Sequence, residues 1–498
     1  MGAVGSSPVV RVSTHGGATG SGQVVVAARD AADSVPVVRT GPTGIREQDP
    51  LVMTTSEGRT AFFGDPAPSV VRDLVATLED GTVPTDGADA VVEHDPEIAT
   101  LPVPETGPLS VGRRLVLGPC GWVDPLDPAD CSFAATERDA RTVTDAGLLG
   151  RGRGDAAADA PVADVWETVR TADGAPVVVG NANNADETSR ADETLLAGAP
   201  LAVLDGMAAV AEHVGADDAV LCLNETDTGL HQQLRDAIDA AADVLPVVPQ
   251  LVAGPDEYRA GAPTAALEAL EGADRIEPRI QPPTPAEHGL YGRPTVVHTP
   301  RTFAHVRHAI QESPAPDCRS RLFTVTGDVT QPATIELPSN ATLAATRDAV
   351  EMVGSFKMAC VGGVLGGITR HLDVAPTARS LQAADLGTDG IVELLNDDRC
   401  SVATAGERAK FAARENSGRC VPGREGTQQL TELLREIYQG SFETDKIREL
   451  GRVMTRSSNC QIGAHAPRPV TTAIDEFEPE FRAHTDGRCP SGSCMETR

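Results

Sequence analysis

Short apolar runs alternate with alanine-rich stretches of helical spacing over the middle of the chain, between residues 120 and 310. The apolar runs Val177–Gly180 and Ala219–Asn224 predict strands, and the amphipathic stretches Leu201–His213 and Leu230–Ala242 predict helices. Strands and helices that alternate in this way form a sheet with helices packed on it. The middle of the chain therefore predicts a layered α/β domain.

The N-terminal segment predicts a second, smaller α/β domain. Val9–Val12 and Val35–Val38 are short apolar runs, two further strands flank Glu57 and Gly58 as a hairpin, and Ser69–Leu78 has helical spacing. The stretch that follows is rich in Pro, Asp, Thr and Gly, a composition typical of a linker.

The C-terminal third predicts a compact sheet and then a helical bundle. Arg321–Leu337 alternates with period two, Leu343–Met352 has helical spacing, and Cys400–Tyr438 and Asp445–Phe481 are helical and amphipathic. The predicted fold is thus α/β and multidomain, with a small domain at 1–80, a linker at 81–118, the layered domain at 119–312, a β-grasp-like domain at 318–395, a helical bundle at 396–485 and a tail at 486–498.

The charge balance excludes one class of partner. Acidic residues outnumber basic ones by 72 to 42, which gives a net charge of −30. A field of this sign repels phosphate backbones, so we expect no nucleic-acid binding. The lysines are Lys357, Lys410 and Lys446. A low number of lysines beside a large excess of acidic residues is typical of a halophilic protein, because molar salt screens the repulsion between its charges. An acidic protein from a GC-rich genome is the alternative.

Neither a membrane span nor a secretory signal is predicted. No run approaches the roughly 18 apolar residues that a span requires, and Met1–Val10 has no basic segment before an apolar one. We therefore expect a cytoplasmic protein that does not cross a membrane. Ten cysteines are scattered through the chain, which argues against a disulfide framework.

Three places offer candidate binding residues, each with a structural alternative. Gly147–Gly154 is dense in glycine before a helix, as anion-binding loops are, although most such loops only turn the chain. In Gly362–Gly367 bare backbone can approach another group closely. Cys420 and Cys460 lie in the helical part as metal ligands or as inert buried thiols. The isolated histidines, among them His298, lack metal-site spacing and are interpreted as structural or surface residues.

In order along the chain, several segments resemble one family. Glu277–Thr295 is similar to the P-R-x-x-P-P-x-P-A-x-x-G-L-x-G-x-P-T segment of the NADH-binding flavoprotein subunit of respiratory complex I and of its relatives in NAD(P)-reducing hydrogenases. Arg321–Pro338 resembles the β-grasp insert of that family, Arg424–Thr427 and Cys460–Gly463 resemble its cluster-binding bundle, and residues 8–80 resemble its thioredoxin-like ferredoxin domain. The resemblance implies a thioredoxin-like N-terminal domain, a flavoprotein-like FMN- and NADH-binding α/β domain, a β-grasp insert and a C-terminal iron–sulfur-binding-like helical bundle.

The iron–sulfur motifs depart from the family pattern. A [4Fe–4S] cluster takes four thiolates, but two of the family's ligand positions are Ser417 and Gly423, which leaves Cys420 and Cys460 as an incomplete metal-binding set. This count predicts that a [4Fe–4S] cluster is disfavoured. The family's [2Fe–2S] ligands align with Ser13, Ala18, Pro42 and Arg46, none of them cysteine, so we expect no [2Fe–2S] cluster.

The flavin motif is also altered. The resemblance implies FMN and NADH as cofactors, and Gly150, Arg151, Gly152 and Asn181 are the matching cofactor-binding positions that survive. Arg153–Ala158 loses later glycines of the loop and gains a carboxylate. Several acids and amides of the family are replaced at 183–184, 261–263 and 298–302, by neutral residues or, at Arg301, by a basic one. These changes remove directed hydrogen bonds on which such a site depends.

The resemblance implies a subunit that passes hydride from NADH to FMN and electrons onward through iron–sulfur centres, beside other subunits of a redox complex and at a membrane only through that complex. Taken literally, the residues predict a divergent paralogue that has lost its clusters and its flavin. The alternative is a non-catalytic scaffold or a ligand-binding subunit that uses the remodelled cleft. No catalytic residue is assigned. Cys489 and Cys494 resemble the C-P-x-G-x-C start of the family's C-terminal ferredoxin, either as a remnant or as ligands of a metal shared with a partner.

Overall fold

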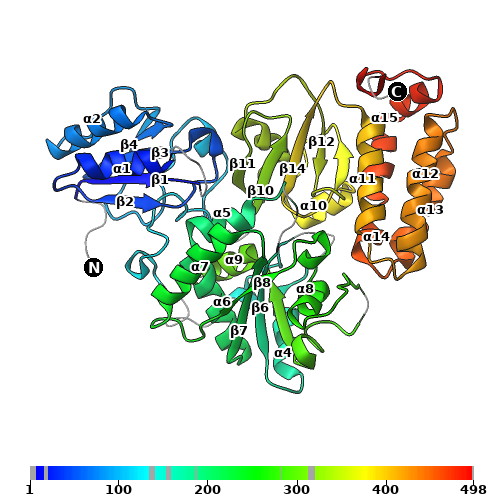
Figure 1. The fold of residues 1–498 in the computed structure, drawn as a ribbon, viewed down its shortest axis with the longest axis horizontal. Coiled ribbons are helices and arrows are strands. Elements are labelled where there is room, and N and C mark those ends of the chain that lie inside the picture. The colour runs from blue at the N-terminus through cyan, green and yellow to red at the C-terminus, as the bar shows by residue number, and fades with distance from the viewer. Residues whose placement is uncertain are drawn as a thin grey trace.

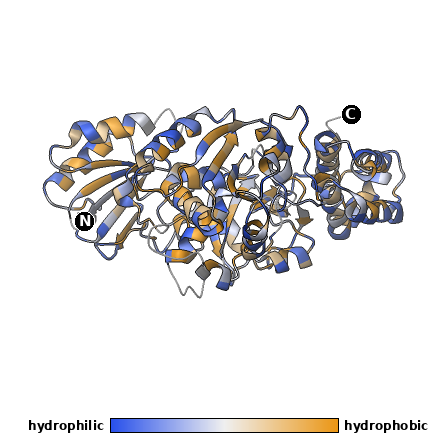
Figure 2. Cartoon of the chain, turned by 90° about the horizontal axis from the view of Figure 1, so that it is seen from below, coloured by the Kyte–Doolittle hydropathy of each residue, from blue (hydrophilic) through white to orange (hydrophobic). Residues whose placement is uncertain are grey.

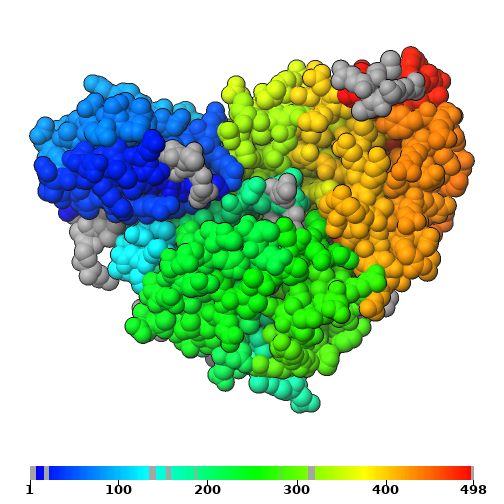
Figure 3. Space-filling view, in the orientation of Figure 1, coloured from blue at the N-terminus to red at the C-terminus, as the bar shows by residue number. Residues whose placement is uncertain are grey.

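The structure is a computed structural model that describes residues 7–15, 21–133, 141–152, 159–183, 186, 188–280, 282–311 and 320–495. It is an α/β chain with three sheets, followed by helices that pack side by side (Figure 1). In the space-filling view the N-terminal part and the C-terminal helices lie at opposite ends of the molecule, with the central residues between them (Figure 3). The strands are mostly hydrophobic, and the outward faces of the helices carry hydrophilic residues (Figure 2).

The first sheet has the strand order β2-β1-β3-β4-β5, with β1 and β2 parallel and the other pairs antiparallel. The predicted hairpin is confirmed, because β3 and β4 pair across Glu57 and Gly58, which both have positive φ (51° and 77°), as the twist of a tight hairpin requires. The elements are β1 (Val9–Ser13), α1 (Ser21–Ala31), β2 (Val37–Thr40), β3 (Leu51–Ser56), β4 (Arg59–Gly64), α2 (Pro68–Glu79) and β5 (Ala90–Glu93).

The segment expected to be a linker, residues 81–118, is more ordered than its composition suggests. It supplies β5 as an edge strand. Its residues Leu101 and Leu109 are buried, together with Trp122, between the first sheet and the third. Pro and Gly break regular structure along this segment, but its few apolar side chains still fill the space between two sheets.

The second sheet is parallel throughout and has the order β8-β7-β6-β9. The predicted strands and helices of this region are confirmed, with helices on both sides of the strands (Figure 1). The elements are α3 (Arg141–Asp145), α4 (Val162–Thr171), β6 (Val177–Ala182), α5 (Ala191–Gly198), α6 (Pro200–Val214), β7 (Asp218–Asn224), α7 (Thr228–Ala241), β8 (Gln250–Gly254), α8 (Pro263–Leu270), β9 (Thr295–His298) and α9 (Pro300–Gln311).

Within the described ranges, no single helix is long and apolar enough to cross a membrane. Helices α5 and α6 reach that length and composition only when taken together, and they are bent by 99° at their junction. Almost all of their residues are buried inside the protein, which is the environment of core helices.

The third sheet has the order β11-β10-β14-β12-β13, in which β10 and β14 are parallel. The helix expected at Leu343–Met352 is a 3-10 helix at Leu343–Ala349, where the Thr346 hydroxyl donates to the carbonyl of Leu343 at 2.6 Å and competes with α-helical pairing. The elements are β10 (Ser320–Gly327), β11 (Ala333–Pro338), β12 (Phe356–Val361), β13 (Gly367–Thr369), α10 (Ala378–Ala383) and β14 (Ile391–Asn396).

The C-terminal helices form an antiparallel bundle whose core continues into the third sheet, since Met358, Ile368 and Leu395 pack with Leu430 and Phe481. The helical prediction for this region is confirmed. The elements are α11 (Ser401–Glu415), a short π-helix at Pro422–Gly426, α12 (Thr427–Ile437), α13 (Thr444–Ser457), α14 (Gln461–His465) and α15 (Arg468–Thr485).

Candidate functional site

A cleft opens where the strand order of the parallel sheet reverses. The chain leaves β6 toward β7 on one side and later returns to β9 on the other, so the strand order reverses between the adjacent carboxyl ends of β6 and β9. Ligands of open α/β sheets bind at such a point. A cavity of about 330 Å³ lies there, bordered by Asn181 at the end of β6 and by His298 and Thr299 at the end of β9. Its walls are mostly apolar, with Val165, Ala286 and Val297 among them.

Two of the predicted cofactor residues, Gly150 and Arg151, also line this cavity. Thr299, which follows β9, and Thr302 in the first turn of α9 hold the loop backbone. The Thr299 hydroxyl donates to the Arg151 carbonyl at 2.6 Å, and the Arg151 N–H donates to the Thr302 hydroxyl at 2.9 Å. Gly152 is the next residue of this loop, and the altered stretch Arg153–Ala158 lies outside the described residues. The threonines at 299 and 302 therefore position the glycine loop, a role that the sequence analysis did not identify.

A network of charged side chains lies behind the loop. Arg321 pairs with Asp159 at 2.6 Å, and Arg151 lies 3.9 Å from the same carboxylate. Arg301 binds Asp192 through two nitrogens. Burial, and secondarily the charge of Arg321, lowers the pKa of Arg151 to about 9. Three guanidinium groups face two carboxylates in this network, and the buried Nε of Arg151 has no partner among the described residues, so these five side chains carry an excess of positive charge.

Asn181, the fourth predicted cofactor residue, borders the cavity but uses its amide on the chain itself. Its Nδ2 donates to the carbonyls of Ala260 and Gly261 at 3.2 and 3.0 Å, and its Oδ1 accepts from the N–H of Asn183. The side chain therefore fixes the segment at 260–261 against the end of β6. The buried Oδ1 of Asn183 has no partner in the described part of the chain. Asn184 lies outside that part.

His298 forms part of the cavity wall as a neutral residue. Burial lowers its pKa to about 4, and its Nε2 accepts a hydrogen bond of 3.0 Å from the indole N–H of Trp166. Its interpretation as a structural histidine agrees with this contact, although the sequence analysis did not place it at the cleft.

The two predicted metal residues, Cys420 and Cys460, come together in the bundle around Gly423. A Cβ added at Gly423 would lie 2.9 Å from the Cys420 sulfur and 3.9 Å from the Cys460 Cβ, so both cysteines lie close to the backbone of this glycine. Ser417 is buried nearby in sequence, and its hydroxyl accepts from the N–H of Arg419 at 3.4 Å. The structure thus unites the two cysteines that the sequence analysis paired.

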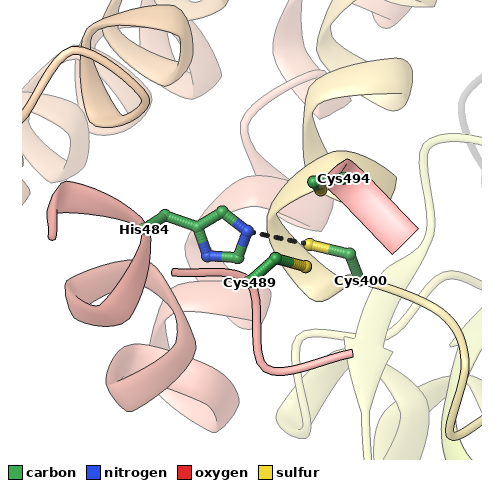
Figure 4. Close-up of side chains that lie close together, drawn as sticks. All are labelled: Cys400, His484, Cys489 and Cys494. Atoms are coloured by element: carbon green, nitrogen blue, oxygen red, sulfur yellow. Dashed lines mark hydrogen bonds between the residues drawn. The ribbon is translucent and has the colours of Figure 1, made fainter. Parts of the chain in front are cut away.

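The structure also gathers four side chains that the sequence analysis did not combine. The sulfurs of Cys400, Cys489 and Cys494 and a ring nitrogen of His484 all lie within 4.8 Å of one another (Figure 4). Cys400 is the N-terminal cap of α11, His484 lies in the last turn of α15, and the other two follow α15. The H-x4-C-x4-C spacing of His484, Cys489 and Cys494 was the sequence signal that could have indicated a metal site. Cys400 lies far away in the sequence, so no local pattern linked it to the other three.

The remaining motifs have structural roles. Gly362 has a φ of 98°, and a Cβ there would lie 2.1 Å from the Gly387 backbone, so the glycine-rich loop allows two chain segments to touch. In the first sheet, Ser13 donates to the Gly41 carbonyl at 2.9 Å. Arg46 lies 3.8 Å from Glu193 of α5. Pro42 borders a small cavity, and Ala18 lies outside the described residues.

Comparison with known proteins gives matches for the region of the parallel sheet and for the C-terminal helices. Residues 143–308 match the family model of the Nuo51 FMN-binding domain, and residues 403–484 match that of the NADH-ubiquinone oxidoreductase-F iron–sulfur binding region. The F subunit of the NADH-quinone oxidoreductase of Streptomyces coelicolor is 30% identical over 393 residues, which cover 71% of this chain and 85% of that protein. The alpha subunit of the NAD-reducing hydrogenase HoxS of Cupriavidus necator is 27% identical over 462 residues, 87% of this chain and 74% of that one.

Solved structures agree on the fold. A chain of the NAD⁺-reducing [NiFe]-hydrogenase in the H2-reduced state superposes with a TM-score of 0.67 at 24% identity, covering 96% of this chain and 85% of that chain. The mixed α/β multidomain architecture is therefore shared with that hydrogenase chain.

The cofactor expectation drawn from the sequence requires correction. We expected a [4Fe–4S] cluster to be disfavoured, but residues 403–484 match an iron–sulfur binding region and residues 143–308 match an FMN-binding domain. The expectation failed because it rested on the ligand positions of one short motif, whereas the match extends over the whole helical region.

Proposed function

The chain belongs to the family of NADH-binding flavoprotein subunits, and from this premise we propose that it oxidises NADH on FMN bound in the cleft between β6 and β9. The observation that carries the proposal is the cavity at the reversal of strand order, in the region that matches the FMN-binding domain and beside the predicted residues Gly150, Arg151 and Asn181. In the proposed reaction NADH becomes NAD⁺ by loss of a hydride to the bound flavin, after which two electrons leave toward iron–sulfur centres and one proton is released.

The described side chains fit a flavin nucleotide in two respects. The cavity walls are apolar, as a ring system requires, and the excess guanidinium charge behind the loop, with the unpartnered Arg151 Nε, suits a phosphate. When bound, FMN supplies a ring that accepts two electrons as a hydride and gives them up one at a time. Thr299 and Thr302 hold the loop backbone in place, and Val165, Ala286 and Val297 exclude water from the cavity wall.

We further propose that Cys420 and Cys460 are thiolates that this chain offers to an iron–sulfur centre of the bundle. The approach of both cysteines to the backbone of Gly423, where a Cβ would lie only 2.9 Å from the Cys420 sulfur, supports this assignment. The domain names follow the same resemblance: thioredoxin-like for the first sheet and its helices, β-grasp for the third sheet, and iron–sulfur-binding for the bundle.

The relatives are named as subunits of NADH-quinone oxidoreductase and of NAD-reducing hydrogenase. By analogy we propose that this chain works beside other subunits of a redox complex, which receive its electrons.

Two tryptophan substitutions on one helix test the flavin site. Thr168 and Thr171 both lie on α4 and both donate a hydroxyl hydrogen bond to the carbonyl four residues earlier, but Thr168 lines the cavity whereas Thr171 does not. We expect the wild-type protein and Thr171→Trp to retain about one FMN per chain after incubation and desalting and to reduce ferricyanide with NADH. Thr168→Trp fills the cavity and should lose both properties while keeping its circular dichroism spectrum.

A folded wild-type protein that retains no flavin would refute the proposal and favour the scaffold alternative. Equal flavin retention by Thr168→Trp and Thr171→Trp would show that the flavin binds elsewhere.

A further inference from the structure

We propose that Cys400, His484, Cys489 and Cys494 bind one zinc ion with tetrahedral coordination, at a site that fastens the segment after α15 to the start of α11. This site is separate from the flavin cleft and from the Cys420 and Cys460 pair, and the proposal does not depend on NADH oxidation.

The spacing of the four side chains fits a single ion. Their ligand atoms all lie within 4.8 Å of one another, and the Cys400 sulfur lies 3.3 Å from Nε2 of His484. Around tetrahedral zinc, bonds of about 2.3 Å to sulfur and 2.0–2.1 Å to nitrogen place neighbouring ligand atoms about 3.5–3.8 Å apart. A cubane cluster binds its ligands on four separate irons, which spreads those ligands further apart.

The histidine presents the correct nitrogen to the group. Its Nδ1 lies 2.7 Å from the Glu480 carbonyl oxygen. A carbonyl only accepts, so Nδ1 carries the proton, and in the neutral ring Nε2 then has a free lone pair that faces the thiols (Figure 4). A hydrogen bond from the second ring nitrogen to a carbonyl is the usual support of a metal-bound histidine.

The cysteine at the start of α11 is also placed as a thiolate ligand. Cys400 is the N-terminal cap of α11, and its sulfur accepts from the backbone N–H of Ala403 at 3.4 Å. The positive end of a helix stabilises a thiolate, which is the form that binds metal.

The two helices that carry Cys400 and His484 are tied together by protein contacts alone. The Glu480 carboxylate accepts from the Ser401 hydroxyl at 2.8 Å and pairs with Lys357 at 2.8 Å. Cys400 and His484 are therefore held near each other before a metal binds. The metal would then fasten the segment that carries Cys489 and Cys494 to them.

The surroundings favour a closed, structural site. The Tyr438 ring meets the His484 ring edge to face at 5.3 Å, and its hydroxyl lies 3.7 Å from the Cys494 sulfur. Cys489 and Cys494 pack against the apolar core of the bundle. Four protein ligands leave no open position for a substrate, and three thiolates with one imidazole are a ligand set that zinc prefers.

The direct test is metal analysis of the complete chain, purified without added metal and with reductant present. We expect about one zinc per chain in the wild-type protein and in Cys131→Ser, which removes a partly exposed thiol outside the group. Cys420→Ser should also keep its zinc. Cys489→Ser and Cys494→Ser should lose it, and their flavin content should equal that of the wild type.

X-ray absorption at the zinc edge of the wild-type protein requires no variant to fold, and we expect three sulfur ligands and one nitrogen ligand. Cobalt substituted for zinc should give the ligand-field bands of a tetrahedral thiolate site. A wild-type protein without zinc, iron lost together with Cys489, or a disulfide between Cys489 and Cys494 in the reduced preparation would overturn the proposal.

Discussion

Replacing Arg301 by methionine removes the central link between α5, α9 and the loop before β14. The guanidinium binds the Asp192 carboxylate through Nε and Nη2 at 2.7–3.1 Å, and its Nη1 reaches the Asp389 carbonyl at 2.5 Å. Both charged side chains are only 6% exposed. In the variant, the Asp192 carboxylate stays buried with the backbone N–H of residue 301 as its remaining contact to α9.

The cost follows from this geometry. Removing one partner of a buried ion pair leaves an uncompensated charge, which lowers the free energy of unfolding by about 3–5 kcal/mol. For a large domain this shifts the melting temperature by roughly 10 °C. The double variant Arg301→Met/Asp192→Leu removes both charges and should recover most of the loss.

The assay is thermal unfolding followed by circular dichroism, with Arg482→Met as the matched control. Arg482 pairs with Glu478 on the surface of α15, with exposures of 69% and 41%, and such a pair contributes about 0.3–0.5 kcal/mol. Molar salt should abolish the control effect but not the effect at Arg301, since buried pairs are screened much less. Equal shifts in Arg301→Met and Arg482→Met would refute the reasoning.

Three further perturbations test other parts of the structure. Burial raises the pKa of Asp49 to about 7 against the opposing charges of His15 and Arg46, so the free energy of unfolding should fall as pH rises from about 4 to about 7. Denaturant titrations at about pH 5 and about pH 8 should show that Asp49→Asn lacks this fall. Above about pH 7 the variant should be more stable than the wild type by at most about 4 kcal/mol. Gly362→Ala places a Cβ 2.1 Å from Gly387 at a φ of 98° and should lower the free energy of unfolding by more than about 2 kcal/mol; an unchanged melting temperature would contradict the close approach. With a net charge of −30, the melting temperature should rise steadily from 0.1 to 2 M KCl, and no rise would exclude self-repulsion as a limit on stability.

Hydrophobic and turn patterns within short segments predicted the helices, strands and hairpin that depend mainly on those segments. The alternating apolar runs fixed the positions of β6, β7, α6 and α7, and Glu57 with Gly58 located the first hairpin. The cleft between β6 and β9 could also be predicted, because Gly150, Arg151 and Asn181 belong to recognisable segments and line one cavity.

Features formed by distant segments could not be predicted in the same way. Composition alone gave no sign that Leu101 and Leu109 would be buried between two sheets. The meeting of Cys400 with His484 depends on how α11 and α15 pack, which no single window of the sequence records. The expectation about the iron–sulfur cluster was wrong for another reason, since it rested on one short motif and not on the whole helical region that matches the family.

The parallel pairing of β10 with β14 affects how the chain is made. Thr324 of β10 pairs with Ile391 of β14, about 70 residues later in the chain. A ribosome that adds roughly 5–20 residues per second needs several seconds to synthesise that interval, during which the inner edge of β10 has no neighbouring strand. An unpaired strand edge invites association with other chains. Nascent chains stalled between these two strands should therefore be the form of this protein that depends most on chaperones.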